Sequence, residues 1–255
     1  MPLQIVTVPC LSDNYAYLMH DDATGDTALV DAPEVAPIEA ALAERGWRLT
    51  DILVTHHHHD HIEGVDALRA ADGARVIGAA RDVHRLPALD LAAADGETVE
   101  VCGTPVTVLD VSGHTVGHIA FHVPAAKAVF TADSLMALGC GRLFEGTAPQ
   151  MWVSLSKLAA LPDDTDIYSG HEYTAANARF ALTIEPDNAA LKARAEAVAQ
   201  ARAEGRPTVP STLAEEKATN PFLRAALPAL KDSLGMSGAA DEDVFAEIRG
   251  RKDRF

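Results

Sequence analysis

Residues 54–61 read VTHHHHDH and place five histidines and one aspartate in eight positions. The run is internal and is interrupted by Asp60, whereas an affinity tag sits at a chain end and repeats one residue. A short apolar stretch, DILVT (51–55), precedes the histidines, and apolar residues at helical spacing follow from Ile62 onward. The sequence therefore predicts an ordered loop between a strand and a helix, where functional side chains often gather.

The spacing inside this run predicts two pairs of metal ligands. In an extended backbone alternate side chains point the same way, so His56 and His58 share a face while His57 points away. Where the chain turns into the helix, Asp60 and His61 can reach a second point nearby. The pattern H-x-H-x-D-H is therefore typical of a metal site rather than of low complexity.

A zinc-protease motif is a second interpretation of the same histidines. On a helix, His57 and His61 would form an i, i+4 pair of the HExxH type. That motif requires glutamate directly after its first histidine as the general base. The position holds His58, so we do not favour this interpretation.

Three later segments each end in a possible ligand after an apolar strand: His114 after TVLDVSG, Asp133 after AVFTA and His171 after DIYSG. Each one alone is better explained as an ordinary histidine or a turn residue. Together with the first run, they supply seven ligands from four segments, which is enough for two ions that share a carboxylate. His118 is interpreted as a neighbour of His114 rather than as a ligand.

Composition limits the classes of partner. The chain has 255 residues, 48% of them apolar, and a formal net charge of −16, so we expect neither a nucleic-acid nor a membrane partner. Three widely spaced cysteines indicate no disulfide framework. The N-terminal segment lacks the features of a signal peptide, and we expect a cytoplasmic protein.

The spacing of apolar residues along the chain predicts how it is organised into domains. Short strands alternate with helices up to about residue 150, and beyond residue 172 the sequence is almost wholly helical. This order predicts an α/β sandwich followed by a helical domain. Within the helical part, Ser211 is a candidate N-cap for a helix that contains Glu215.

The motifs resemble known families. Four of them resemble the metallo-β-lactamase superfamily in order and approximate spacing: THHHHDH (55–61), GHTVGH (113–118), FTADS (130–134) and GHEYT (170–174). Three more stretches resemble the glyoxalase II, or hydroxyacylglutathione hydrolase, family: GCGRLFEGT (139–147), NPFLR (220–224) and RGRKDRF (249–255). The resemblance implies an αββα metallo-β-lactamase sandwich over residues 1–172 and a C-terminal helical substrate-binding domain over residues 173–255.

The resemblance also implies roles for individual residues. One metal ion would be held by His56, His58 and His114, the other by Asp60, His61 and His171, and Asp133 would bridge the two. Two Zn²⁺ ions per chain are expected, although nitrogen and oxygen ligands also suit iron and manganese. The glutathione contacts implied are Arg142, Phe144, Tyr173, Arg249 and Lys252. Some relatives carry lysine and tyrosine where this chain has Arg142 and Phe144.

The implied reaction is hydrolysis of S-(2-hydroxyacyl)glutathione, chiefly S-D-lactoylglutathione, to glutathione and D-lactate, the second step of methylglyoxal detoxification. A metal-bridging hydroxide would attack the thioester, and Asp60 would orient it. A thiolate with a pKa of about 8.5 can leave without a general acid. We expect a monomer whose only partner is the small-molecule glutathione thioester.

Other functions are compatible with part of the pattern. A persulfide dioxygenase with one iron also carries HxHxDH, although such enzymes generally lack the long helical domain. Hydrolysis of β-lactams and processing of RNA fit the acidic charge and the C-terminal stretches less well. A metal-binding protein without catalytic activity is the alternative from another class, and it predicts no thioester turnover.

Overall fold

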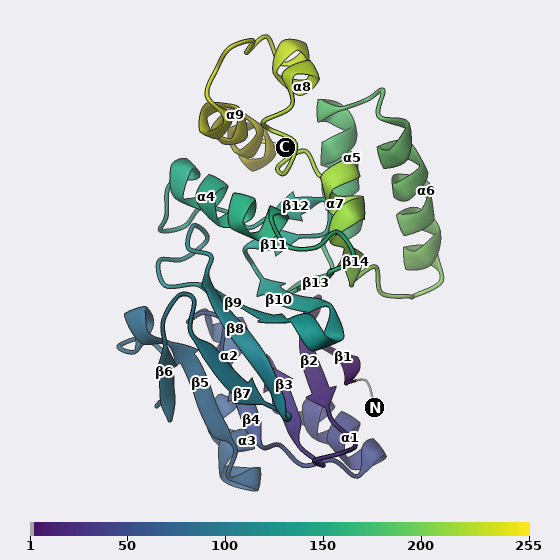
Figure 1. Ribbon diagram of the computed structural model, residues 1–255. Coiled ribbons are helices and arrows are strands. Elements are labelled where there is room, and N and C mark those ends of the chain that lie inside the picture. The colour runs from purple at the N-terminus through teal and green to yellow at the C-terminus, as the bar shows by residue number, and fades with distance from the viewer. Residues whose placement is uncertain (1–2) are drawn as a thin grey trace. The chain divides into compact units, whose positions relative to one another are not determined.

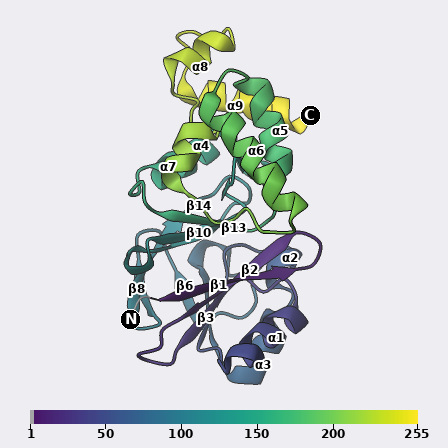
Figure 2. The same cartoon turned by 90° about the vertical axis from the view of Figure 1, so that its right-hand side faces the viewer.

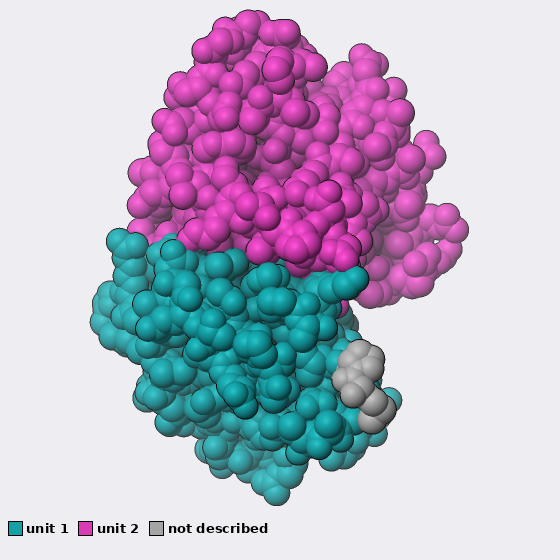
Figure 3. Space-filling view, viewed as in Figure 1, with its two compact units in different colours: residues 1–110, 117–131 teal, residues 111–116, 132–255 magenta. Residues whose placement is uncertain are grey.

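The computed structural model describes residues 3–255, which form two compact units. Unit 1 comprises the chain up to residue 110 together with residues 117–131, and unit 2 comprises residues 111–116 and 132–255. Figure 3 colours unit 1 teal and unit 2 magenta. Because these units are interleaved in sequence, the domain boundary at residue 172 stays a prediction.

The first sheet of unit 1 has six strands in chain order (Figure 1): β1 (Gln4–Cys10), β2 (Asn14–His20), β3 (Thr27–Val30), β4 (Asp51–Leu53), β5 (Arg75–Ala79) and β6 (Leu91–Ala93). The first three strands pair antiparallel, and β3 to β6 pair parallel. Parallel neighbours require crossover connections; α1 (Val35–Arg45) and α3 (Val65–Asp72) lie in the first two, and the β5–β6 connection contains the short helix η1 (Ala80–Asp82). The possible metal ligands that follow β4 therefore lie at the carboxyl end of a buried parallel strand.

Unit 1 also contains four strands of a second sheet: β7 (Thr98–Val101), β8 (Thr104–Asp110), β9 (Ile119–Val123) and β10 (Ala128–Ala132). They pair antiparallel, with Val108 opposite Phe121. The two sheets pack face to face: the rings of Tyr17 and Phe130 lie 5.6 Å apart. The Sγ atom of Cys102 donates to the carbonyl of Met19 across the same interior at 3.3 Å. These two sheets and their helices confirm the predicted α/β sandwich.

Unit 2 is mainly helical (Figure 2). Its helices are α4 (Ala148–Ala159), α5 (Thr174–Ile184), α6 (Ala189–Ala203), α7 (Leu213–Thr219), α8 (Pro228–Ser233) and α9 (Asp241–Asp253). Two short pairs accompany them, β11 (Leu135–Met136) with β12 (Gly139–Cys140) and β13 (Asp166–Ser169) with β14 (Ser211–Thr212). Leu138, Ala178, Ala181 and Leu191 form a buried apolar cluster at the α5–α6 pair.

The predicted cap of α7 was wrong by one residue. Thr212 is the N-cap, and its side chain accepts a hydrogen bond from the backbone of Glu215. The hydroxyl of Ser211 instead donates to the buried carboxylate of Glu216 at 2.6 Å. A hydroxyl that donates to a buried, charged carboxylate makes a stronger hydrogen bond than a hydroxyl that accepts from a backbone amide at a helix end.

Within residues 3–255, no helix has both the length and the apolar character needed to cross a membrane.

Candidate metal centre

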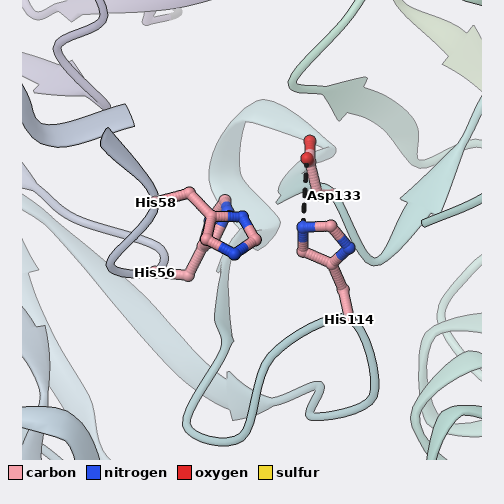
Figure 4. Close-up of side chains that lie close together, drawn as sticks. All are labelled: His56, His58, His114 and Asp133. Carbon is pink, nitrogen blue, oxygen red and sulfur yellow. Dashed lines mark hydrogen bonds and ion pairs between the residues drawn. The ribbon is translucent and has the colours of Figure 1, made fainter. Parts of the chain in front are cut away.

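The histidine run of unit 1 adopts the predicted strand-to-helix turn. His58 is extended, with φ −62° and ψ 140°, and it precedes the short helix α2 (His59–Ile62). Figure 4 shows the side chains of His56 and His58 extending to the same side of the loop, and Nε2 of His56 lies 3.1 Å from Nδ1 of His58. On α2, Nε2 of His61 lies 3.8 Å from Oδ2 of Asp60. His56, His58, Asp60 and His61 are called the first ligand set below.

The two remaining histidines of the run point elsewhere. His57 lies 3.3 Å from the buried carboxylate of Asp82 and 3.2 Å from a guanidinium nitrogen of Arg85. His59 is exposed and pairs with Glu63 one turn later in the chain. The direction of His57 agrees with the period-two argument, whereas His59 already belongs to α2, where that argument does not apply.

Asp31 fixes the orientation of two members of the first ligand set, a role that the sequence did not reveal. Its carboxylate, only 2% exposed, accepts hydrogen bonds from the backbone and hydroxyl of Thr55 and lies 2.8 Å from Nδ1 of His61. The Thr55 hydroxyl gives its one proton to Asp31, so it must accept from Nδ1 of His56, 3.0 Å away. Both His56 and His61 therefore carry the proton on Nδ1, which leaves the lone pair on Nε2.

Unit 2 brings three further predicted ligands together: His114, Asp133 and His171, called the second ligand set below. Oδ2 of Asp133 lies 3.4 Å from Nε2 of His114 and 3.3 Å from Nε2 of His171. Figure 4 shows the contact between His114 and Asp133 as a dashed line. All three side chains are buried. One carboxylate oxygen thus lies within the spacing of metal ligands from two imidazole nitrogens.

The protonation of His114 indicates that a cation fits this set. Its Nδ1 lies 2.8 Å from the carbonyl of Arg142, which can only accept, so Nδ1 carries the proton of the neutral ring. In the neutral ring the lone pair of Nε2 then faces the carboxylate of Asp133, and a proton or a metal ion between the two atoms makes this contact favourable. Two ligand atoms on tetrahedral zinc are about 3.3 Å apart, close to the separations within each set. The donor chemistry of both sets therefore fits a metal ion.

Gly141 has no side chain, and this leaves room for Asp133 and His114 of the second ligand set. A Cβ atom on this residue would lie 1.9 Å from the carbonyl oxygen of Asp133 and 2.9 Å from Nδ1 of His114. Backbone atoms cannot move aside as a flexible side chain can. The glycine of the GCGRLF stretch is therefore required by packing around Asp133 and His114.

We predict that Gly141→Ala weakens metal affinity by at least about tenfold and lowers the metal retained per chain, because loss of a hydrogen bond to a metal ligand already weakens binding by that factor. Metal analysis after gel filtration measures this. Gly205→Ala is the matched control, since Gly205 has no neighbour in the position of a Cβ, although its φ of 71° adds local strain. Full metal content in the Gly141 variant would contradict the packing argument.

The basic residues expected to contact substrate lie in unit 2. Arg249, 6% exposed, donates to the carbonyl of Cys140 and to Asp253, both at 2.9 Å. The ammonium group of Lys252 lies 5.1 Å and 5.3 Å from the ring centres of Phe180 and Phe255. Burial, reinforced by the charges of Arg249 and Arg179, lowers the pKa of Lys252 to about 8. Lys252 therefore loses its positive charge at a lower pH than an ordinary lysine does.

The aromatic residues expected at the same place pack on the second ligand set. The ring of Phe144 meets His114 edge-on at 5.3 Å, and Tyr173 stacks on His171 at 4.7 Å. Both aromatic side chains remain exposed, at 62% and 40%. Arg142 extends over Phe144, with its guanidinium carbon 5.9 Å from the ring centre. These three residues are accessible to a ligand, and the rings of Phe144 and Tyr173 also pack on the imidazoles of His114 and His171.

His118 supports the first ligand set. Its ring stacks on His56, with centres 4.5 Å apart and an angle of 14° between the planes. This contact agrees with its interpretation as a neighbour, although the sequence indicated proximity to His114 rather than stacking on His56.

Comparisons with known proteins extend over the whole chain. Residues 12–171 match the model of the metallo-beta-lactamase superfamily, and residues 172–255 match that of the hydroxyacylglutathione hydrolase C-terminus. The hydroxyacylglutathione hydrolases of Ruegeria pomeroyi and Roseobacter denitrificans are 69% and 65% identical, each over 100% of both chains. The solved structure of ETHE1 from Myxococcus xanthus is similar with a TM-score of 0.69 and 28% identity, covering 98% of this chain and 90% of that one.

Proposed function

The chain belongs to the hydroxyacylglutathione hydrolase family of the metallo-β-lactamase superfamily, and from this premise we propose that it hydrolyses S-(2-hydroxyacyl)glutathione thioesters. The substrate we propose is S-D-lactoylglutathione, which yields glutathione and D-lactate in the second step of methylglyoxal detoxification. The observation that carries the proposal is the shared Asp133 oxygen, 3.4 Å and 3.3 Å from two imidazole nitrogens. The seven predicted ligands exceed the four that a tetrahedral zinc ion takes, which supports two ions joined by this carboxylate.

We assign the ligands as two groups joined by one residue. His56, His58 and His114 would hold one ion, Asp60, His61 and His171 would hold the other, and Asp133 would bind both. We propose Zn²⁺ for both positions, because neutral imidazoles and carboxylates suit it, as they also suit iron and manganese. The assignment is supported by the Nδ1 protons of His56, His61 and His114, which leave each Nε2 lone pair for a metal.

Divalent ions in such a centre act as Lewis acids and lower the pKa of water toward neutrality. The protein therefore does not need a nucleophilic side chain, and its sequence has no G-x-S-x-G motif. We assign to Asp60 the orientation of the attacking water through its carboxylate. The glutathione thiolate, with a pKa of about 8.5, leaves without a side-chain acid.

Binding of glutathione is assigned to Arg142, Phe144, Tyr173, Arg249 and Lys252. Arginine and lysine bind carboxylates by charge-assisted hydrogen bonds, and Arg249 already donates to the carboxylate of Asp253 in the absence of substrate. Phe144 lacks the hydroxyl that some relatives have at this position. Exposed Arg142 lies over Phe144 and can supply a donor there instead.

The pKa of Lys252 leads to a pH prediction. Its pKa of about 8 lies below the ordinary lysine value, so the ammonium loses its charge as pH rises from 7 to 9. We expect KM for S-D-lactoylglutathione to rise by about threefold to tenfold over this interval, since a charged contact is lost, while kcat changes less.

Initial rates measured across this pH range check the prediction in wild type and in two variants. Lys252→Arg keeps its charge and should show a flat KM, and Lys252→Met should show a high KM throughout. A rise in KM of equal size in wild type and Lys252→Arg would assign the titration to another group.

The proposed function is tested with S-D-lactoylglutathione and purified, metal-loaded protein. We expect glutathione and D-lactate to be released in equal amounts by protein that contains two metal ions per chain. No turnover by fully loaded protein would favour a metal-binding role. One iron per chain with oxygen uptake on a glutathione persulfide would favour a dioxygenase.

We further propose a cytoplasmic, monomeric protein without nucleic-acid or membrane partners. The three cysteines are free and buried, which suits a reducing compartment. The net charge of −16 disfavours binding to polyanions.

A further inference from the structure

Asn14 lies at a rigid position in unit 1, next to the histidine run. It is the first residue of β2 and pairs with Cys10 across the β1–β2 hairpin. The hairpin loop begins at Leu11, whose φ of 50° is unusual for a residue with a side chain. The backbone amide of Leu11 donates to Oε2 of Glu34 at 2.8 Å. Strand register and loop anchoring together fix where the side chain of Asn14 can reach.

The side-chain amide of Asn14 serves one residue. Its Nδ2 donates to the backbone carbonyl of Asp60 at 3.0 Å and to Oδ2 of the same residue at 3.1 Å. An amide nitrogen has two protons, so both are used on Asp60. Asn14 is only 4% exposed, whereas the Asp60 side chain is 41% exposed. A buried, fixed donor thus contacts both the partly exposed carboxylate and the backbone carbonyl of Asp60.

The charge of the donor matters for a carboxylate that binds metal. A lysine or arginine at this distance would hold the carboxylate as well, but it would repel a cation. A neutral amide favours the ionised carboxylate without adding positive charge. Asn14 can therefore orient Asp60 while leaving its charge available to an ion.

Loss of the Asn14 side chain should weaken the binding of only one of the two proposed ions. Both donors of Asn14 go to Asp60, while His56 is oriented separately through Thr55 and Asp31. The proposed function assigns Asp60 and His56 to different ions. A loss confined to Asp60 should therefore weaken one ion and spare the other.

We propose that Asn14 is a positioning residue that holds the Asp60 carboxylate ready for metal and thereby tightens the ion bound by Asp60, His61 and His171. This inference rests on the proposed two-ion function. Loss of a hydrogen bond to a metal ligand typically weakens binding by about 10–100-fold. We expect that factor for this ion in Asn14→Leu, and an unchanged affinity for the ion held by His56 and His58.

The test is a zinc titration of metal-free full-length protein against a chromophoric chelator. Asn14→Leu removes both donors at similar volume, and Asn14→Asp keeps the shape but replaces the donors by acceptors. Ser12→Ala, at an exposed position of the same loop, is the control and should bind both ions as wild type does. Excess zinc should restore kcat in Asn14→Leu, with a KM near the wild-type value, which a misfolded site would not allow.

Three outcomes would overturn the proposal: equal weakening of both ions in Asn14→Leu, wild-type affinity for both ions, or wild-type binding in Asn14→Asp. Should Asn14→Leu fail to fold, Asn14→Ser retains one donor and should weaken the same ion by a smaller factor. Wild-type protein that binds two ions but hydrolyses no thioester would overturn the proposed function. The comparison of the two ion affinities would still decide the role of Asn14.

Discussion

Asp133→Ala is expected to lower kcat/KM for S-D-lactoylglutathione by about 10³-fold or more. Loss of a contact behind a ligand already costs about 10–100-fold, and Asp133 is the one residue assigned to both ions. In unit 2 its Oδ2 atom lies within 3.4 Å of both His114 and His171. Its removal leaves two buried imidazoles without the anion that they share, so the metal content should fall as well.

Initial rates and metal analysis on the same samples measure both effects. Asp133→Asn keeps the size of the side chain but removes its charge, and we expect an intermediate loss in which metal content falls before the fold is affected. Asp187→Ala is the control, because Asp187 is an exposed aspartate of unit 2. Asp133→Ala with two ions and more than a tenth of the wild-type kcat/KM would rule out the bridging role.

The histidine run shows how far local pattern can predict a site. Period two in an extended segment separated His56 and His58 from His57, and the turn into α2 placed Asp60 next to His61. Both results depend on neighbours in sequence, which a single sequence displays. The same is true of the longer strands and of helices with several turns, whose apolar periods are complete.

Contacts between residues that are far apart in the sequence produce no local pattern from which they can be predicted. Asp31 is 24 residues from Thr55 and 30 from His61, and no residue pattern around it indicates either contact. Asn14 is the first residue of β2 and lies 46 residues from its partner Asp60. The short elements β6, β11 and β12 were missed, because two or three residues cannot show a period.

The NPFLR stretch gains a structural explanation that the family resemblance did not supply. Asn220 donates to the carbonyls of Met136 and Gly139, at 3.1 Å and 3.0 Å, and to Glu216 at 2.9 Å. These bonds hold the β11–β12 turn, which leads directly to Gly141. A motif used to recognise the family thus supports the loop that shapes the second ligand set.

Glu216→Ala should produce the largest loss of stability among single substitutions in unit 2. Glu216 is fully buried, and its carboxylate accepts from Arg194, Ser211, Asn220 and the backbone amide of Leu138. Arg194, 9% exposed, would keep its charge without this partner. Breaking a buried ion pair from one side costs about 3–5 kcal/mol, which for a chain of this size lowers Tm by about 6–20 °C.

Thermal denaturation of matched variants separates the buried charge from the lost packing. Glu215→Ala, an exposed neighbour on the same helix, should stay within about 0.5 kcal/mol of wild type. In Arg194→Met/Glu216→Leu the buried charge is gone, while the amide of Leu138 still lacks its acceptor, so this protein should melt between Glu216→Ala and wild type. If the double variant is instead the least stable of the three, the hydrogen bonds to Leu138 and Asn220, rather than the ion pair, hold this part of unit 2 together.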